Sequence, residues 1–201
     1  MNPLEALNIA AFLRINADLQ TPHWKINAAA FVADYLIYLI PLLVIALWCW
    51  GKGLHRNWAV KACLVALAAL GMNQIIIALW PHPRPFMAGV GHSFMAHAPD
   101  ASFPSDHATV FAAIGLTLVF GSLRSVIGWN VLALGMIVAW VRIFLGVHFP
   151  LDMVGAVAVV CLAWTAIHLA WGSVGNAIVS RIEQIYRLVL ARPISHGWIG
   201  R

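Results

Sequence analysis

Charged residues are scarce in this chain. Of its 201 residues only 9% are Asp, Glu, Lys or Arg, whereas about 25% is usual in a soluble domain. Hydrophobic residues make up 62%, and the mean hydropathy is +0.86. This excludes a soluble globular enzyme and a disordered protein. The net charge of +5 comes from cations too scattered to form a basic stripe, so we expect no nucleic-acid partner; positively charged loops of a membrane protein explain it better.

Cysteine is also rare. Cys49, Cys63 and Cys161 lie inside apolar runs, and an odd count without paired spacing predicts neither a disulfide framework nor a zinc site. The sequence has no His-Glu-x-x-His, Cys-x-x-Cys or dense carboxylate cluster, so we expect no metal and no cofactor. Glu5 and Arg14 interrupt the N-terminal apolar face, which predicts that no cleavable signal is present.

Long apolar stretches predict an all-α fold, a polytopic membrane bundle of five to six transmembrane helices that forms a single domain over residues 1–201. A spanning helix needs about 20 mostly apolar residues. The segment 4–19 is amphipathic and suits the membrane interface, although a sixth crossing there stays open; the tail 174–201 is predicted to be a surface-lying helix. The five expected spans are residues 29–50, 58–80, 108–123, 126–145 and 151–171.

The basic residues predict an orientation. If the five spans alternate, most Lys and Arg fall on one side, which the positive-inside rule makes cytoplasmic. The long loop 81–107 and the short loop around His148 then face the external side. The basic residues on the predicted cytoplasmic side are Lys52, Arg56, Lys61, Arg124, Arg181, Arg187, Arg192 and Arg201.

Polar residues gather in three segments on the predicted external side, where ionisable groups at a membrane edge indicate function. Arg84 and Arg142 supply planar forks that suit phosphate oxygens. Ser105 stands where it can cap the third span, whose first N–H groups also favour an anion. These residues predict a phosphate cradle. The segments are Trp80-Pro-His-Pro-Arg-Pro-Phe86, Ser102-Phe-Pro-Ser-Asp-His107 and Val141-Arg-Ile-Phe-Leu-Gly-Val-His-Phe-Pro-Leu-Asp152.

The same segments predict proton and covalent chemistry. His148 and Asp152 are four residues apart, so if Pro150 opens the last span the carboxylate can accept from one ring nitrogen and leave the other nucleophilic. His107, on a different helix, could donate a proton to a leaving oxygen. Together they indicate a phosphohydrolase that works without metal.

Each residue taken alone also has an ordinary explanation. Arg84 can snorkel at the membrane edge, and Ser105 can simply cap a helix. His82 could touch a diphosphate or be an interfacial histidine, and His92 and His97 are weaker candidates. It is the joint occurrence of the three segments that favours a phosphate site.

The three segments resemble the signature of the type 2 phosphatidic acid phosphatase superfamily, which is Lys-x6-Arg-Pro, Pro-Ser-Gly-His and Ser-Arg-x5-His-x3-Asp. The matching parts occur here in the same order across roughly residues 80–152. The chain departs from the signature at Ile77, which stands in the place of the lysine, at Asp106 in place of the glycine and at Val141 in place of the serine. The matching parts are Arg84-Pro85, Pro104-Ser-Asp-His107 and Arg142-x5-His148-x3-Asp152.

The segment from His97 to His107 and the closing Pro193-Ile-Ser-His-Gly-Trp198 are similar to the undecaprenyl-diphosphatase branch of this superfamily. The resemblance implies hydrolysis of a polyprenyl diphosphate lipid, undecaprenyl diphosphate, to undecaprenyl phosphate and phosphate. It places this reaction at the periplasmic face of the bacterial inner membrane, where the lipid carrier of cell-wall synthesis is recycled and bacitracin resistance arises.

The resemblance also implies residue roles. His148 is the nucleophile that forms a phosphohistidine, Asp152 orients it and His107 protonates the leaving group. The phosphate-binding set is Arg84, Ser105 and Arg142, to which we add Asp106 and His82.

Three alternatives stay open. One is phosphate transfer from undecaprenyl diphosphate to lipid A, and another is a phosphatidylglycerophosphate or phosphatidate phosphatase. The third is a non-enzymatic transporter of a lipid phosphate. The acceptor, the polyprenyl length and the oligomeric state do not follow from the sequence.

Overall fold

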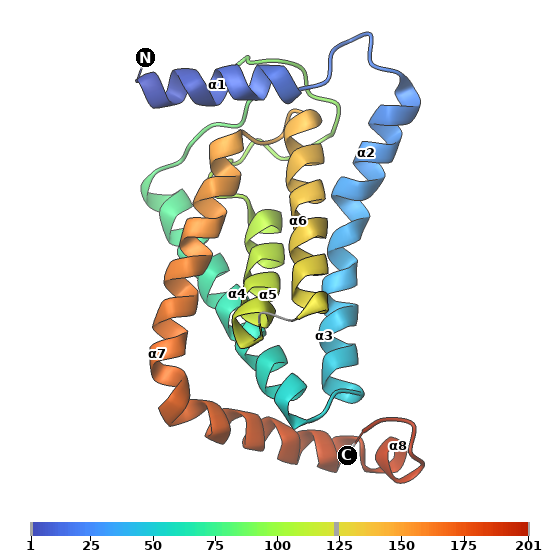
Figure 1. The fold of residues 1–201 in the computed structure, drawn as a ribbon. Coiled ribbons are helices and arrows are strands. Elements are labelled where there is room, and N and C mark those ends of the chain that lie inside the picture. Colours follow the sequence, from blue (N-terminus) through green and yellow to red (C-terminus); the bar gives the residue numbers. More distant parts are fainter. Residues whose placement is uncertain (1, 123–124, 201) are drawn as a thin grey trace.

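The computed structural model describes residues 2–122 and 125–200, and within them all regular secondary structure is helical (Figure 1). The predicted all-α class is therefore confirmed. Arg124 and Arg201, two of the basic residues used for orientation, lie outside the described residues. The elements are α1 (Pro3–Ile15), α2 (His23–Tyr35), the 3-10 helix η1 (Leu36–Tyr38), α3 (Leu39–Cys49), α4 (Gly53–Leu79), α5 (Asp106–Gly121), α6 (Val126–Phe144), α7 (Pro150–Val189) and α8 (Ala191–Ser195).

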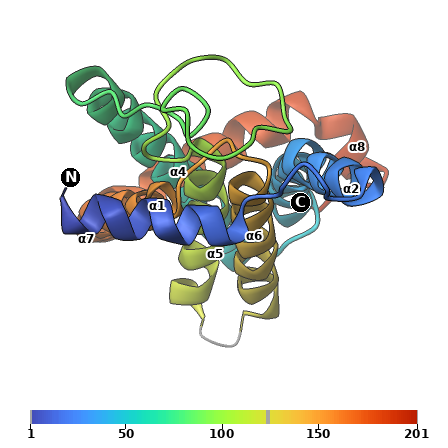
Figure 2. The same ribbon diagram turned by 90° about the horizontal axis from the view of Figure 1, so that it is seen from above.

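Four helical stretches are long and apolar enough to cross a membrane, which makes this a multi-pass membrane protein. They are His23–Cys49, which combines α2, η1 and α3, and the helices α4, α6 and α7. The remaining expected span, α5, has only 16 residues. It packs against α4, α6 and α7 near the middle of the bundle (Figure 2), so most of its side chains contact protein.

Two glycines let α5 and α6 approach closely. A Cβ at Gly135 of α6 would lie 2.6 Å from the Cβ of Phe111, and one at Gly115 of α5 would lie 2.6 Å from Leu132. Both contacts are shorter than atoms of real side chains allow. This packing holds α5 and α6 together along their length, and His107 lies in the first turn of α5 while Arg142 lies in the last turn of α6.

Helix α1 lies across one end of the bundle and does not run along it (Figures 1 and 2). Its 13 residues span about 20 Å, less than the roughly 30 Å of a bilayer core. Phe12 is fully buried and meets the ring of Phe149 edge-on at 5.2 Å. Helix α1 therefore does not form a sixth membrane span. It lies across the end of the bundle and packs beside the start of α7.

The opposite end of the bundle carries the α3–α4 turn, the last part of α7 and α8 (Figure 1). Helix α7 changes direction there and continues across the bundle, as expected for a surface-lying tail. Two of the basic residues used to predict the orientation, Arg56 and Lys61, lie in helix α4 and not in a loop. Arg56 is buried and donates to the carbonyl of Gly200, and the buried Lys61 contacts His168 with Nζ 2.8 Å from Nδ1.

The loop between α4 and α5 is held against the end of α6. Asn16 donates to the carbonyls of His92 and Phe144 at 2.9 and 3.0 Å and accepts from the N–H of His92 at 2.7 Å. Gly146 has φ +83°, and a Cβ there would collide with the His92 carbonyl. Only glycine adopts a positive φ and leaves room for the His92 carbonyl without strain. This close approach brings the α4–α5 loop and the α6–α7 connection together.

Candidate active site

A polar cavity of about 380 Å³ is lined by residues of the loops and helix ends in the half of the bundle that carries α1. It collects residues from the loop 80–105, from the first turn of α5, from the end of α6 and from the α6–α7 connection. Its lining residues are Gln74, Ile77, Arg84, His97, Asp100, Ala101, Pro104, Asp106, His107, Arg142 and His148.

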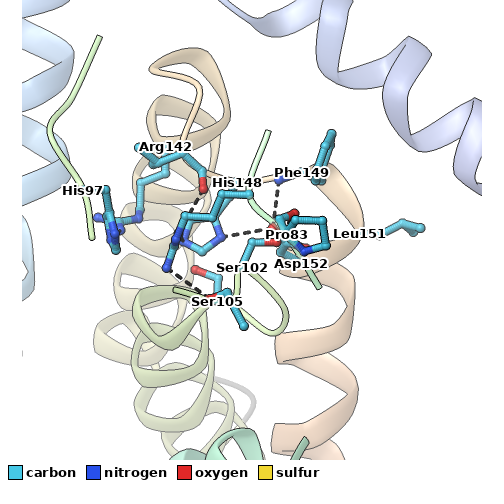
Figure 3. Close-up of polar contacts among 12 residues, drawn as sticks. Pro83, His97, Ser102, Ser105, Arg142, His148, Phe149, Leu151 and Asp152 are labelled. Carbon is cyan, nitrogen blue, oxygen red and sulfur yellow. Dashed lines mark hydrogen bonds and ion pairs between the residues drawn. The ribbon is translucent and has the colours of Figure 1, made fainter. Parts of the chain in front are cut away.

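His148 and Asp152 form a buried pair at the start of α7 (Figure 3). The helix begins at Pro150, and Nδ1 of His148 lies 3.0 Å from Oδ2 of Asp152. The same oxygen accepts the N–H of Phe149 at 2.8 Å. Because the carboxylate accepts a hydrogen bond from Nδ1–H, the Nε2 atom of the neutral ring carries the lone pair. The His148 ring lines the cavity.

The His148 imidazole is held in its neutral form. Burial lowers its pKa to about 4, the positive charges of Arg142 and Arg84 act in the same direction, and Asp152 opposes them. A neutral imidazole is the nucleophilic form of the side chain. The environment therefore keeps this histidine reactive at neutral pH.

Arg84 is buried and reaches four groups. Its Nη1 donates to the carbonyl of Val147 at 2.9 Å and lies 3.2 Å from Nε2 of His148. Its Nε donates to Asp100 at 2.8 Å, and Nη2 donates to the carbonyl of Ala101 at 3.3 Å. The guanidinium is thereby fixed beside the free nitrogen of His148.

Arg142 approaches the cavity from α6 together with His97. Its Nη2 lies 3.3 Å from Nε2 of His97, whose ring centre is 6.4 Å from that of His148. The Nε of Arg142 is buried and has no partner among the described residues. An unpartnered buried N–H suits a ligand oxygen, because leaving it unpaired is costly.

The loop residues His97 and Asp100 were underweighted or missed by the sequence prediction. Burial and the charge of Arg84 lower the pKa of His97, so that ring too favours its neutral form. Burial alone would raise the pKa of Asp100, but the hydrogen bond and charge of Arg84 lower it. The short spacing of His97-Ala-Pro-Asp100 before Ser105 was the available signal for a polar loop folded over the site.

Ser105 precedes α5 at its N-cap position, yet its hydroxyl makes no capping bond. The predicted side-chain cap is therefore wrong. The Oγ atom is buried and has no partner among the described residues, while the Ser105 carbonyl accepts from Thr109. Ser105 is fully buried and does not line the cavity, although its neighbours Pro104 and Asp106 do, so its contact with a phosphate stays a prediction.

Asp106 lines the cavity and ties α5 to α4. Its Oδ1 accepts from Nδ2 of Asn73 at 2.8 Å, and the same amide nitrogen donates to Thr109 at 2.9 Å. An ionised carboxylate has no hydrogen to offer a phosphate. In the structure Asp106 therefore makes a positioning contact with α4, and its phosphate contact stays a prediction.

His82 is not among the residues that line the cavity, so the structure does not bring it together with Arg84 and Arg142. Its ring packs edge-on against Phe149 at 5.9 Å and near Trp80 at 5.7 Å, and Nε2 lies 3.9 Å from Glu5. Aromatic packing and the carboxylate of α1 hold the ring away from the lining residues. His92, a weaker candidate, is exposed and acts through its backbone bonds to Asn16.

The fold and the cavity define a multi-pass helical membrane protein with a cavity lined by histidine, carboxylate and arginine side chains. Residues 58–176 match the PAP2 superfamily, and the chain belongs to that superfamily. It is 36% identical over 98% of both chains to the putative undecaprenyl-diphosphatase YbjG of Escherichia coli (strain K12). It is 31% identical to the undecaprenyl-diphosphatase BcrC of Bacillus subtilis (strain 168), over 80% of this chain and 81% of BcrC.

The fold is also similar to a solved structure, that of LpxE from Aquifex aeolicus. The TM-score is 0.63 at 20% sequence identity, and the similarity covers 80% of this chain and 93% of LpxE. At this identity the likeness concerns the helical arrangement.

Proposed function

We propose that this protein is an undecaprenyl-diphosphate phosphatase, which hydrolyses the lipid to undecaprenyl phosphate and inorganic phosphate. The observation that carries the proposal is the neutral His148, backed by Asp152 and faced by Arg84, within a cavity at the end of a membrane bundle. The names of the two relatives specify the lipid.

The first chemical step is transfer of the terminal phosphoryl group to His148. Arg84, Arg142 and the Ser105 hydroxyl hold its oxygens, so that negative charge developing there is stabilised by preorganised donors. Nε2 forms a bond to the terminal phosphorus while the bond to the bridging oxygen breaks. His107 gives a proton to that oxygen, and undecaprenyl phosphate leaves. Burial and the positive charge of Arg142 lower the pKa of His107 to about 3, so the negative charge of the bound diphosphate is needed to hold this proton on the ring.

The second step is hydrolysis of the phosphohistidine. Neutral His107 now accepts a proton from water, whose oxygen attacks the same phosphorus as the bond to Nε2 breaks. Inorganic phosphate leaves and His148 returns to its neutral form. Asp152 stabilises the charge on the imidazole in both steps and keeps the ring in one tautomer.

We place the protein in the bacterial inner membrane with the cavity at the periplasmic face. The lipid chain must remain in the bilayer while the diphosphate stays at headgroup depth. The cavity lies at the end of the bundle, which suits this division. The basic residues at the other end, including Lys52 and Arg187, support a cytoplasmic assignment for that end.

The test uses the purified full chain in detergent with undecaprenyl diphosphate whose terminal phosphate is labelled with ³²P. We expect labelled inorganic phosphate and an acid-labile label on the protein that is lost in His148→Ala. Release by His148→Ala at the wild-type rate would overturn the proposal. Supplying lipid A in the same assay identifies the acceptor, because a phosphotransferase would move the label to that lipid.

A further inference from the structure

The cavity has one wall that the proposed mechanism does not use. Gln74 and Ile77, one helical turn apart on α4, both line it. Ile77 is the position that the superfamily signature gives to a lysine, and an isoleucine side chain has no hydrogen-bonding group. Gln74 is therefore the group on this wall that can bind a polar ligand through its side chain.

Gln74 is exposed although it belongs to a membrane-spanning helix. It lies five residues before the end of α4 at Leu79, about 7 Å along the helix axis at 1.5 Å per residue. Its carboxamide has no hydrogen-bond partner among the described residues. A polar side chain at that depth needs water or a polar ligand, because lipid tails cannot hydrogen-bond to it.

The level of Gln74 along the bundle is fixed by its neighbour. Asn73 donates to Asp106 and Thr109 in the first two turns of α5. Gln74 consequently lies at the level of His107, the proposed proton donor to the leaving oxygen. In an in-line displacement the leaving oxygen lies opposite the attacking atom, so the leaving phosphate is placed away from His148 and on the side of His107 and α4.

We propose that the Gln74 carboxamide binds the ester-linked phosphate of the substrate and makes the site prefer a diphosphate to a monophosphate. The inference rests on the proposed function and deepens it. The amide NH₂ donates to an oxygen of the phosphate that remains on the lipid, while the arginines hold the phosphate that is transferred. A lipid monophosphate fills only the arginine end and leaves Gln74 without a phosphate to bind.

A neutral amide at this position also suits product release. Breaking the bridging bond leaves an anionic lipid phosphate as the product, which a lysine at position 77 would hold strongly. A hydrogen bond from an uncharged donor to this anion is weaker than one from a cation. The lipid product can then leave the α4 wall without separating an ion pair.

The test compares farnesyl diphosphate with farnesyl phosphate, two probes with the same lipid chain and different phosphate counts. We expect Gln74→Leu to lower the ratio of kcat/KM for the diphosphate over the monophosphate by about tenfold, as loss of a hydrogen bond to a charged group does. Gln74→Glu should lower the ratio further because its carboxylate repels the phosphate. The matched control Ile75→Ala changes a lipid-facing residue of the same helix, exposed by 60%, and should keep the wild-type ratio.

The results separate this inference from the proposed function. If wild-type protein fails to hydrolyse undecaprenyl diphosphate, the proposed function is wrong. If it is active and Gln74→Leu and Gln74→Glu keep the wild-type ratio, the inference is wrong and the function stands. Ile77→Lys gives an independent check. A cation on the same wall should raise the affinity for the lipid monophosphate product and so increase product inhibition. If product inhibition does not increase, this wall is not a phosphate subsite.

Discussion

Nη1 of Arg84 lies 3.2 Å from Nε2 of His148, so a guanidinium N–H covers the lone pair of the proposed nucleophile. The same nitrogen donates to the carbonyl of Val147. For Nε2 to attack phosphorus, the N–H must turn from the imidazole to a phosphate oxygen. When the substrate phosphate binds, the same movement of the Arg84 N–H would form a hydrogen bond to a phosphate oxygen and expose the lone pair of His148 Nε2.

This relationship predicts that lysine cannot replace Arg84. An ammonium group lacks the planar fork that reaches Asp100, Val147 and phosphate together. We expect Arg84→Lys to lower kcat/KM for farnesyl diphosphate by about 100-fold, the order found when one charge-stabilising donor is lost. Arg187→Lys is the matched control, because that side chain is 50% exposed at the other end of the bundle; equal rates for the two variants would contradict the assignment.

A second prediction concerns Asp100, which lies in an anion site although it is itself an anion. Its carboxylate orients Arg84 through Nε and also repels phosphate. Asp100→Asn should therefore lower kcat by about fivefold, since the hydrogen bond weakens, while KM falls. Steady-state kinetics separate the two parameters, with Asp18→Asn in an exposed turn as the control. A rise in KM without a change in kcat would rule out this positioning role.

The pH dependence follows from the pKa of His148. Burial lowers it from 6.5 to about 4, so the ring takes up a proton only as the pH falls towards 4. We expect the acid limb of kcat/KM, which reports the free enzyme, to lie near pH 4. A ³¹P NMR titration of the free substrate measures the pKa values of its phosphate groups, so that their contribution to the pH profile can be identified. An acid limb near 6.5 that the substrate does not explain would contradict the prediction.

The same shift has a consequence for stability. The unfolded chain binds a proton at His148 below pH 6.5, whereas the folded protein does so only near 4. Its contribution to stability is thus complete above pH 6.5 and is lost progressively as the pH falls towards 4.

The pair formed by His148 and Asp152 could be predicted from the short distance between the two residues in the sequence. His148 and Asp152 are four residues apart around a proline that starts a helix, so their contact follows from helix geometry. The contacts of His82 could not be predicted in this way, because its partners, Glu5 and Phe149, are distant in sequence. His97 was undervalued for the same reason, since only the folded loop brings it to Arg142.

The helical spans were predictable from hydropathy, but their packing was not. Apolar runs locate α6 and the start of α7 to within a residue and the end of α4 likewise, because a bilayer sets the length of a span. They do not show that α7 continues to Val189 as one helix, 18 residues beyond the expected end of the span at 171. Nothing in the run of α5 shows that it lies at the centre, because that depends on glycines of α6 meeting side chains of α5, such as Gly135 with Phe111. The orientation of α1 likewise depends on Phe12 meeting Phe149, a long-range contact.

A further prediction tests α1 as a support for the site. The buried Asn8 accepts the N–H of Leu151 at 3.1 Å, next to Asp152 in the first turn of α7. Asn8→Ala leaves that N–H unpaired and should cost about 1 kcal/mol of stability, like the loss of a helix cap. Thermal unfolding in detergent measures this loss. Asn2→Ala removes an exposed cap of α1 and should cost less; equal losses would argue against a role of Asn8 at the site.

The orientation of the bundle can be tested by chemical labelling of whole cells. His92 is exposed in the loop that also carries the cavity-lining residues His97 and Asp100, and His196 is exposed directly after α8. Helix α8 lies at the opposite end of the bundle from α1 (Figure 1). In a variant whose three cysteines, all free of disulfides, are replaced by alanine, we expect His92→Cys to react with a membrane-impermeant maleimide and His196→Cys to react only after the inner membrane is opened. Outer-membrane permeabilisation precedes labelling where such a membrane is present. The reverse pattern would place the cavity in the cytoplasm, where the site could not act on a periplasmic diphosphate.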